Sequence, residues 1–193
     1  MQPARLLMLS LVVALANAAT TFAAETGVID LSRAVTIAPE DTAIIHTAQR
    51  MLVEEIEKRT NLTLTSATEF AQDAQPAILL CRVNKAPAGR RDFVAAMNVP
   101  DKPEGFAISI DDSGNAPVVV LAGRDERGVL FAAGRLLLRL TLKPGTVELP
   151  ADFQVATAPR YPHRGHQIGY RNLAHCYDAW TPETYEQYMR ELA

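Results

Sequence analysis

Residues 157–171, which read TAPRYPHRGHQIGYR, limit most strongly what this chain can fold into. The two prolines in this stretch hold the backbone extended and exclude it from a helix interior or a central strand, so we expect a linker. A strand-like run follows from His163 to Tyr170. A helix start follows at Thr181 and Pro182, because threonine caps helices and proline fits the first helical position. This order predicts the beginning of a second, larger domain.

The predicted last helix, residues 182–193, has only about three turns, and such a helix is marginal without a surface to pack on. We therefore expect the chain to be truncated, or to be a fragment of a longer gene product. The remaining length suits one domain, and a hydrophobic content of 48% with 21% charge is typical of a globular one. The net charge of −3, without a basic stripe, predicts no nucleic-acid partner.

The N-terminus has the layout of a secretory signal peptide. Arg5 precedes an apolar run from Leu6 to Ala16, and small residues then offer a cleavage site after Ala18 or after Ala23. The run is shorter than the roughly 20 residues that a membrane-spanning helix needs. We predict export to the periplasm or the cell exterior, with no membrane association after cleavage; an uncleaved anchor is the alternative.

Two stretches predict helices. In the first, Ile45, Ala48, Leu52 and Ile56 recur at three- and four-residue spacing, with Asp41 as the expected cap and Asn61 as the left-handed residue that ends the helix. The second begins at the capping residue Asp125 and carries a continuous apolar stripe: Val129, Leu130, Ala133, Leu136, Leu137 and Leu140.

Between these helices lies the strongest hairpin pattern in the chain. Residues 106–110 alternate apolar with small or polar side chains, residues 111–115 form a turn, and residues 118–122 return. The returning strand is apolar on both faces, so it should be central in a sheet. Cys81 lies in another apolar strand and should be a small core residue; whether it pairs with Cys176 stays open.

The remaining pattern completes an α/β fold. Further strands are predicted at residues 28–31, 34–37, 63–66, 77–82 and 147–149, while residues 83–104 lack a convincing period and are expected to be an irregular surface connection. The sum is a mostly antiparallel sheet with two helices on one face.

Two stretches resemble one group of enzymes. Residues 121–137, LAGRDERGVLFAAGRLL, resemble the strand-to-helix passage that closes the small N-terminal α/β domain of bacterial β-N-acetylhexosaminidases and α-glucuronidases. Residues 158–165, APRYPHRG, resemble the join between that domain and the first strand of the catalytic (β/α)8 barrel. The resemblance implies a signal peptide at 1–24, a hexosaminidase domain-2-like accessory domain at 25–156, and the linker and first strand and helix of a truncated barrel at 157–193.

The resemblance also implies a carbohydrate substrate, bound through the missing barrel, and no cofactor. The catalytic acids of this group come from later barrel strands, so no catalytic residue is assigned and the fragment should be inactive. An arginine on the first barrel strand binds the terminal sugar, and Arg164 with Gly165 matches that motif. The hexosaminidase pattern continues with an acidic residue and a second arginine, where Gly169 and Asn172 stand here. Besides a hexosaminidase-like enzyme, an α-glucuronidase-like enzyme or an uncharacterised relative therefore stays open.

His166 and Tyr170 complete the predicted substrate-binding set with Arg164. His166 either contacts sugar inside the barrel or packs, and the ring of Tyr170 either stacks on sugar or packs. His163, His166, His175 and Cys176 are four potential zinc ligands in one short stretch. We do not predict a zinc site, because His163 and His166 are three residues apart and would face opposite sides of a strand.

Arg127 and Gly128, in the first turn of the second helix, lack the other glycines and the lysine of a phosphate-binding loop. We interpret them as a tight strand-to-helix junction with a structural salt bridge. The alternative for the whole chain is a complete non-catalytic periplasmic carbohydrate-binding or interaction module, whose residues 163–193 fold back on the domain and resist hydrogen exchange.

Overall fold

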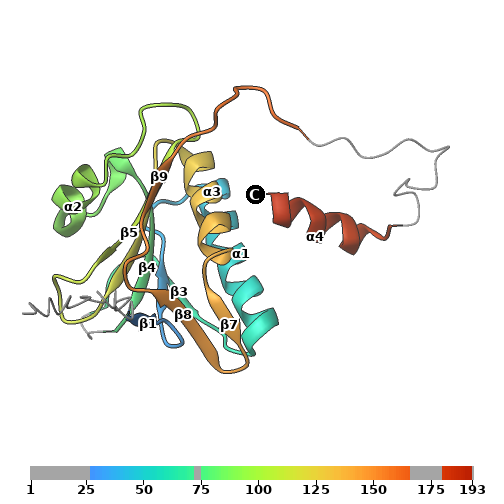
Figure 1. The fold of residues 1–193 in the computed structure, drawn as a ribbon, viewed down its shortest axis with the longest axis horizontal. Helices are drawn as coiled ribbons and strands as arrows, with labels where there is room; N and C mark the ends of the chain where they lie inside the picture. The colour runs from blue at the N-terminus through green and yellow to red at the C-terminus, as the bar shows by residue number, and fades with distance from the viewer. Residues whose placement is uncertain (1–26, 72–74, 166–179, 193) are drawn as a thin grey trace, which may run out of the picture.

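The computed structural model describes residues 27–71, 75–165 and 180–192. Its centre is a six-stranded sheet in the order β3-β2-β4-β6-β5-β9 (Figure 1). The strands are β2 (Val35–Ile37), β3 (Thr65–Ala67), β4 (Ala77–Arg82), β5 (Phe106–Asp111), β6 (Val118–Gly123) and β9 (Val155–Thr157). The predicted signal peptide lies outside the described residues.

The expected mostly antiparallel arrangement is wrong for this sheet. The pairings β2 with β3, β2 with β4 and β4 with β6 are parallel, whereas only β5 with β6 and β5 with β9 are antiparallel. Strand β2 connects to β3 through helix α1 (Ala43–Thr60), and a crossover of that kind joins parallel neighbours. The predicted hairpin of β5 and β6 is confirmed, and β6 is central and buried at every position.

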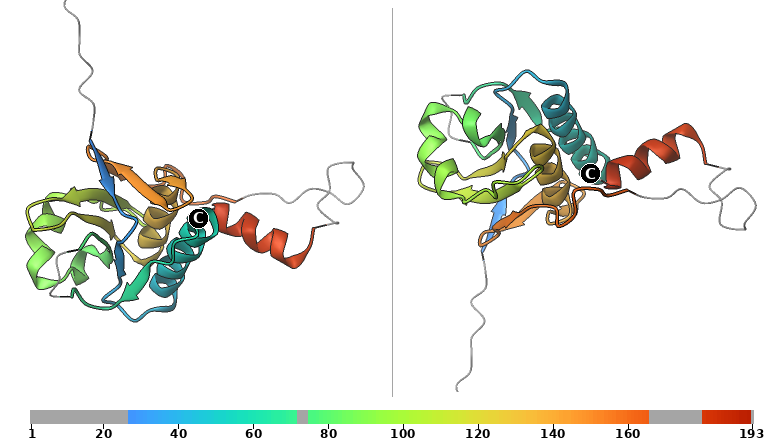
Figure 2. Two further views of the ribbon diagram at one scale, coloured as in Figure 1. Left: turned by 90° about the horizontal axis from the view of Figure 1, so that it is seen from below. Right: turned by 90° about the horizontal axis from the view of Figure 1, so that it is seen from above.

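Helices α1 and α3 (Glu126–Leu137) cover one face of the sheet, which confirms the predicted pair (Figures 1 and 2). Alternate residues of the central strands, Ile78 and Leu80 on β4 and Val119 and Leu121 on β6, belong to the same buried cluster as both helices. Side chains of a strand point alternately to its two faces, so every second residue faces the helices. This cluster is the larger part of the core.

The helix ends follow local capping chemistry. Thr42, not Asp41, caps α1, because its Oγ1 accepts a hydrogen bond from the N–H of Ile45 at 3.3 Å; Asp41 instead pairs with His46 at 2.7 Å. Asn61 ends α1 with φ +59°, as predicted. Asp125 caps α3, as predicted.

A short helix covers the opposite face of the sheet. Residues 83–104, expected to be irregular, contain two 3₁₀ turns and helix α2 (Arg91–Ala96). The fully buried Val94 packs with Leu79 and Cys81 of β4. A helix of six residues is too short to show a helical period of apolar residues in the sequence, so α2 was not predicted. Burial raises the pKa of the Cys81 thiol to about 12, which fits the predicted core role; Cys176 lies outside the described residues.

A second sheet of three antiparallel strands lies beside α1. It has the order β1-β8-β7, from β1 (Val28–Asp30), β8 (Thr146–Pro150) and β7 (Thr141–Lys143). Val147 and Leu149 of β8 enter the core cluster. Gly145, with φ +75°, makes the turn between β7 and β8.

The chain beyond β9 has little regular structure until its last helix. Residues 163–165, the described part of the run predicted as a strand, form no strand, and the remainder lies outside the described residues. Helix α4 (Pro182–Leu192) begins where predicted, and the Thr181 hydroxyl accepts a hydrogen bond from the N–H of Thr184 at 3.4 Å. Within the three described ranges, no helix combines the length and the apolar content needed to cross a membrane.

Candidate functional site

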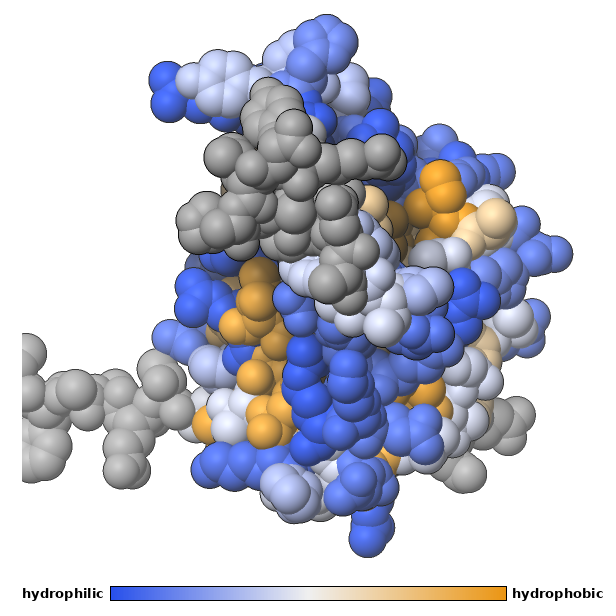
Figure 3. Space-filling view, turned by 90° about the vertical axis from the view of Figure 1, so that its right-hand side faces the viewer, coloured by the Kyte–Doolittle hydropathy of each residue, from blue (hydrophilic) through white to orange (hydrophobic). Residues whose placement is uncertain are grey.

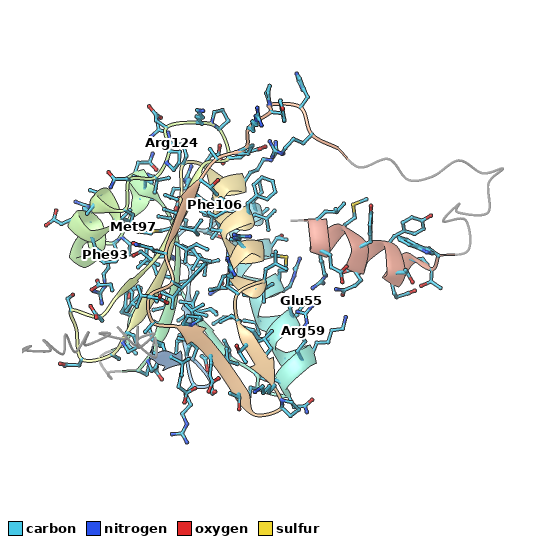
Figure 4. The ribbon with its side chains drawn as sticks, viewed as in Figure 1. Glu55, Arg59, Phe93, Met97, Phe106 and Arg124 are labelled. Carbon is cyan, nitrogen blue, oxygen red and sulfur yellow. The ribbon has the colours of Figure 1, made fainter. Side chains whose placement is uncertain are left out.

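The candidate site is the edge of the six-stranded sheet where the parallel strands β2, β4 and β6 end. In open α/β sheets, ligands bind outside these carboxyl ends. The same edge holds the start of β5 and the end of β9, since Phe106 pairs with both Gly123 and Thr157. The linker therefore leaves the domain at this edge, where Figure 4 labels Phe106 and Arg124.

An ion-pair network occupies the part of this edge next to β4. The Arg82 guanidinium donates through Nε to Glu40 at 2.7 Å and through a terminal nitrogen at 2.5 Å, and it lies 3.7 Å from Glu126. The backbone N–H of Arg82 also donates to Glu40 at 2.9 Å. The side-chain hydrogen bonding to Glu40 raises the pKa of the Arg82 guanidinium above its usual value. The network joins β4 to the segments after β2 and β6.

A second cluster, here named the Glu104 cluster, consists of Glu104, Arg127, Arg164 and Phe131. The Glu104 side chain is only 10% exposed, and each of its oxygens pairs with a different arginine: Oε1 with Arg127 at 2.6 Å, and Oε2 with Arg164. Both guanidinium groups lie over the Phe131 ring, at 6.0 Å for Arg127 and 5.6 Å for Arg164. One buried carboxylate thus joins α3 to the linker.

The backbone around this cluster is fixed by Asp125. Its Oδ1 accepts from the N–H of Gly128 and its Oδ2 from the N–H of Glu104, both at 2.8 Å. A Cβ on Gly128 would lie 2.4 Å from the carbonyl oxygen of Gly105, closer than real contacts allow. The interpretation of Arg127 and Gly128 as a tight junction with a structural salt bridge is therefore confirmed.

An open pocket of about 530 Å³ lies beside the Glu104 cluster. Phe106 and Phe131 line it together with the linker residue Pro159 and with Leu192 of α4. A neighbouring hollow of about 320 Å³ shares both phenylalanines and Leu192 and extends along α3 toward α1. Figure 3, which faces this side of the molecule, shows apolar patches between hydrophilic side chains.

The structure places one of the three predicted substrate-binding residues. Arg164 belongs to the Glu104 cluster, and it also donates to the carbonyl oxygen of Tyr161 at 3.0 Å. His166 and Tyr170 lie outside the described residues. Within the described ranges, no group of three or more histidine, cysteine, aspartate or glutamate side chains is placed to hold a metal ion.

Sequence reasoning missed Glu104 and Phe131. Glu104 lies in a stretch without a readable period, and its partner Arg164 is 60 residues away. Phe131 falls outside the helical stripe that the spacing predicted for the core. Arg127 was the sequence feature that could have pointed to Glu104, because its predicted structural salt bridge required an acidic partner.

The buried carboxylates of the described domain are suited to holding arginines. Glycoside hydrolysis uses two carboxyl groups, one of them a proton donor. Here the acids of low exposure pair with arginines. The pairs are Glu40 with Arg82, Glu55 with Arg59, Glu104 with Arg127 and Arg164, and Asp111 with Arg90.

Comparisons with known proteins agree with this architecture. Among solved structures, the chain is similar to a family GH115 4-O-methyl-α-glucuronidase with specificity for decorated arabinogalactans, at 16% identity and a TM-score of 0.56, covering 86% of this chain and 24% of that one. It is also similar to a mutant Streptomyces plicatus β-hexosaminidase in complex with its GlcNAc product, at 15% identity and a TM-score of 0.46, covering 70% and 24%. No curated protein matches. The chain thus spans about a quarter of the length of either enzyme.

The GH115 likeness shows a shared mixed α/β fold. A family profile described as "Glycosyl hydrolase family 67 N-terminus" matches residues 20–136, more than half of the 193-residue chain. The resemblance to the N-terminal domain of glycoside hydrolases is therefore confirmed, and the chain belongs to the glycosyl hydrolase family 67 N-terminus family.

Proposed function

We propose that this chain is the N-terminal part of an exported glycoside hydrolase that acts in the breakdown of polysaccharides or glycans. The observation that carries the proposal is the family match over residues 20–136. Residues 25–156 serve as the accessory domain, and residues 157–193 are the linker and the first strand and helix of a catalytic barrel. Carbohydrate binds through that barrel.

The accessory domain is non-catalytic in this proposal. Glu40 and Glu104, with side chains only 9% and 10% exposed, lie at the carboxyl edge of the sheet, and both pair with arginines. A general acid must lie within hydrogen-bond reach of the oxygen that it protonates, and these carboxylates are already engaged by arginines. The domain therefore supports the barrel, and its edge orients the linker.

Between the two substrate classes left open, we favour an α-glucuronidase-like one. The sequence departs from the hexosaminidase pattern at Gly169 and Asn172. The solved structure with the TM-score of 0.56 is, by its own description, a 4-O-methyl-α-glucuronidase. Both points favour the α-glucuronidase-like class.

The first test is enzymatic. The purified 193-residue chain is incubated with aryl glycosides of glucuronic acid and of N-acetylglucosamine, and we expect no hydrolysis of either. Turnover by the chain alone, abolished by substituting one of its own carboxylates, contradicts the inactive assignment.

The second test is genetic. The coding DNA downstream of Ala193 should continue in frame with repeating strand and helix units and acidic residues at strand ends. The longer product should hydrolyse the glucuronide faster than the hexosaminide. A stop codon directly after Ala193 in intact genomic DNA would favour the interaction module instead.

Export has its own test. After expression in a bacterial host, the periplasmic fraction should contain a chain whose mass corresponds to cleavage after Ala18 or Ala23. An intact chain that starts at Met1 and stays in the cytoplasmic fraction contradicts export.

A further inference from the structure

Glu104 has a backbone conformation that is unusual for a residue with a side chain. Its φ is +62°, in the left-handed region that a Cβ makes unfavourable. Hydrogen bonds hold the segment in place. The N–H of Glu104 donates to Asp125, the N–H of Gly105 donates to the carbonyl oxygen of Lys102 at 3.0 Å, and the N–H of Arg124 donates to the carbonyl oxygen of Gly105 at 2.8 Å. Strain that neighbouring contacts maintain points to a role for the strained residue.

The side chain of Glu104 points inward and binds two arginines of different origin. Arg127 belongs to α3 and is part of the domain, whereas Arg164 comes from the linker. The Arg164 side chain is 37% exposed, so roughly a third of it remains open to the 530 Å³ pocket and to solvent. The linker is thus attached through the side chain of Arg164 to the carboxylate of Glu104, whose backbone the domain holds in place.

The ring of Phe131 completes the attachment. It lies under the Arg164 guanidinium at 5.6 Å, a distance at which the ring attracts a cation. A hydrogen bond within the linker adds to this, because Arg164 donates to the carbonyl oxygen of Tyr161. Carboxylate, ring and carbonyl together restrict both the position and the orientation of this guanidinium.

We propose that Glu104 is a positioning residue that, with Phe131, holds Arg164 against the accessory domain and so fixes the direction in which the chain leaves it. The two prolines stiffen the linker, and the Glu104 cluster sets its direction. In the proposed glycosidase, the arginine held in this way is the one that the resemblance assigns to the substrate sugar. That consequence rests on the proposed function, whereas the attachment itself does not.

Limited digestion of the full chain with trypsin tests the attachment without any catalysis. Trypsin must take an arginine side chain into its own pocket, so a held arginine is cut slowly. Arg160 lies in the same linker and serves as the internal reference. We expect wild-type protein to be cut after Arg164 more slowly than after Arg160. Glu104→Gln should raise the rate after Arg164 about three- to tenfold and leave the rate after Arg160 unchanged.

The matched control is Arg127→Gln. It removes the other partner of Glu104 but leaves the carboxylate for Arg164, so it should not raise cleavage after Arg164. If Glu104→Gln acted only by loosening the junction, both variants would raise it, and positioning would be overturned. Equal cutting at Arg160 and Arg164 in wild type would also overturn it.

Hydrogen exchange supplies a second readout that does not depend on protease access. In Glu104→Gln, exchange should rise in residues 158–165 and stay unchanged in residues 118–133, which report the junction of β6 and α3. Faster exchange in both segments would mean general unfolding and would overturn the proposal. Failure here leaves the glycosidase tests above unaffected, so the two proposals can fail separately.

Discussion

Among the described residues, two ion pairs that connect the C-terminal part of the chain to the α/β domain differ in construction. In the first pair, here named the Arg164 attachment, Arg164 binds the carboxylate of Glu104, whose side chain is only 10% exposed. Asp125 accepts hydrogen bonds from the backbone N–H groups of Glu104 and Gly128, and Gly128 lies close to Gly105; these backbone contacts are the frame of the attachment. At the Arg190 attachment, Arg190 of α4 pairs at 2.5 Å with Glu54, which is 43% exposed, and Lys58 donates to Gln187 at 2.8 Å on the surface. Exposed pairs contribute only about 0.2–1 kcal/mol. The comparison teaches that Arg164 pairs with a carboxylate fixed inside the fold, whereas Arg190 pairs with a more exposed one at the surface.

The largest expected effect comes from breaking the frame of the Arg164 attachment. Gly128→Ala places a Cβ 2.4 Å from the carbonyl oxygen of Gly105, so the backbone must move. We expect a loss of about 3 kcal/mol in the free energy of unfolding, measured by denaturant titration. Gly89→Ala, at an exposed glycine with nothing within 4 Å, should change it by less than about 0.5 kcal/mol. Equal effects would show that the frame is not tight.

The ion pair of Asp111 with Arg90, which lies outside the Arg164 attachment, tests whether burial alone makes an ion pair important for stability. Burial alone would raise the pKa of Asp111, but hydrogen bonds from Ser113 and the charge of Arg90 hold it below its usual value. A lowered pKa in the folded state adds stability that is present above the unfolded value of about 3.9 and is lost as pH falls through the folded value. Asp111→Asn should therefore cost about 2 kcal/mol at neutral pH.

The pH dependence of unfolding separates this effect from packing. Between pH 5 and pH 2.5, the stability of wild type should fall more steeply than that of Asp111→Asn. The neighbouring Asp112 is exposed, and Asp112→Asn should follow the wild-type curve. Parallel curves for all three proteins would contradict the assigned pair.

Capping gives a smaller effect that still distinguishes the two regions. Asp125→Ala removes the cap of α3 and the acceptor of the Glu104 N–H, and should cost about 1 kcal/mol. Thr42→Ala removes the cap of α1 at a similar cost. Only Asp125→Ala should also speed trypsin cleavage after Arg164; acceleration in both variants would mean that any lost cap loosens the linker.

The smallest effect is expected at the Arg190 attachment. Arg190→Gln should change the free energy of unfolding by about 0.5 kcal/mol or less. Hydrogen exchange in residues 182–192 should be fast in wild type and little changed in the variant. Strong protection of these amides in wild type, lost in Arg190→Gln, would favour the complete interaction module.

Long apolar patterns explain why much of the fold could be predicted. The stripe from Val129 to Leu140 and the doubly apolar strand at 118–122 extend over enough residues for their period to be unambiguous. Helix α2 and strands β7 and β9 have three to six residues and are defined by tertiary contacts, so no local pattern marks them. Strand direction was predicted wrongly because alternation says which face is buried, but not which way a neighbour runs.

The candidate site shows the same limit. A motif pointed to Arg164, but the residue that holds it lies 60 positions earlier in a segment without a pattern. Only the fold brings the start of β5 to the end of β9. Ion pairs between distant segments leave no periodic trace in a sequence.

Both outer strands of the six-stranded sheet, β3 and β9, are only three residues long. An uncovered strand edge invites the sheet of a neighbouring molecule to add on, and proteins avoid this by keeping such edges short or covered. Strand β9 pairs with the first half of the largely buried β5, although it belongs to the segment that leads into the linker. Strand β9, which leads into the linker, thus also covers the edge of β5 and so protects the protein from aggregation through that edge. A protein cut before Val155 would expose this apolar edge and should self-associate.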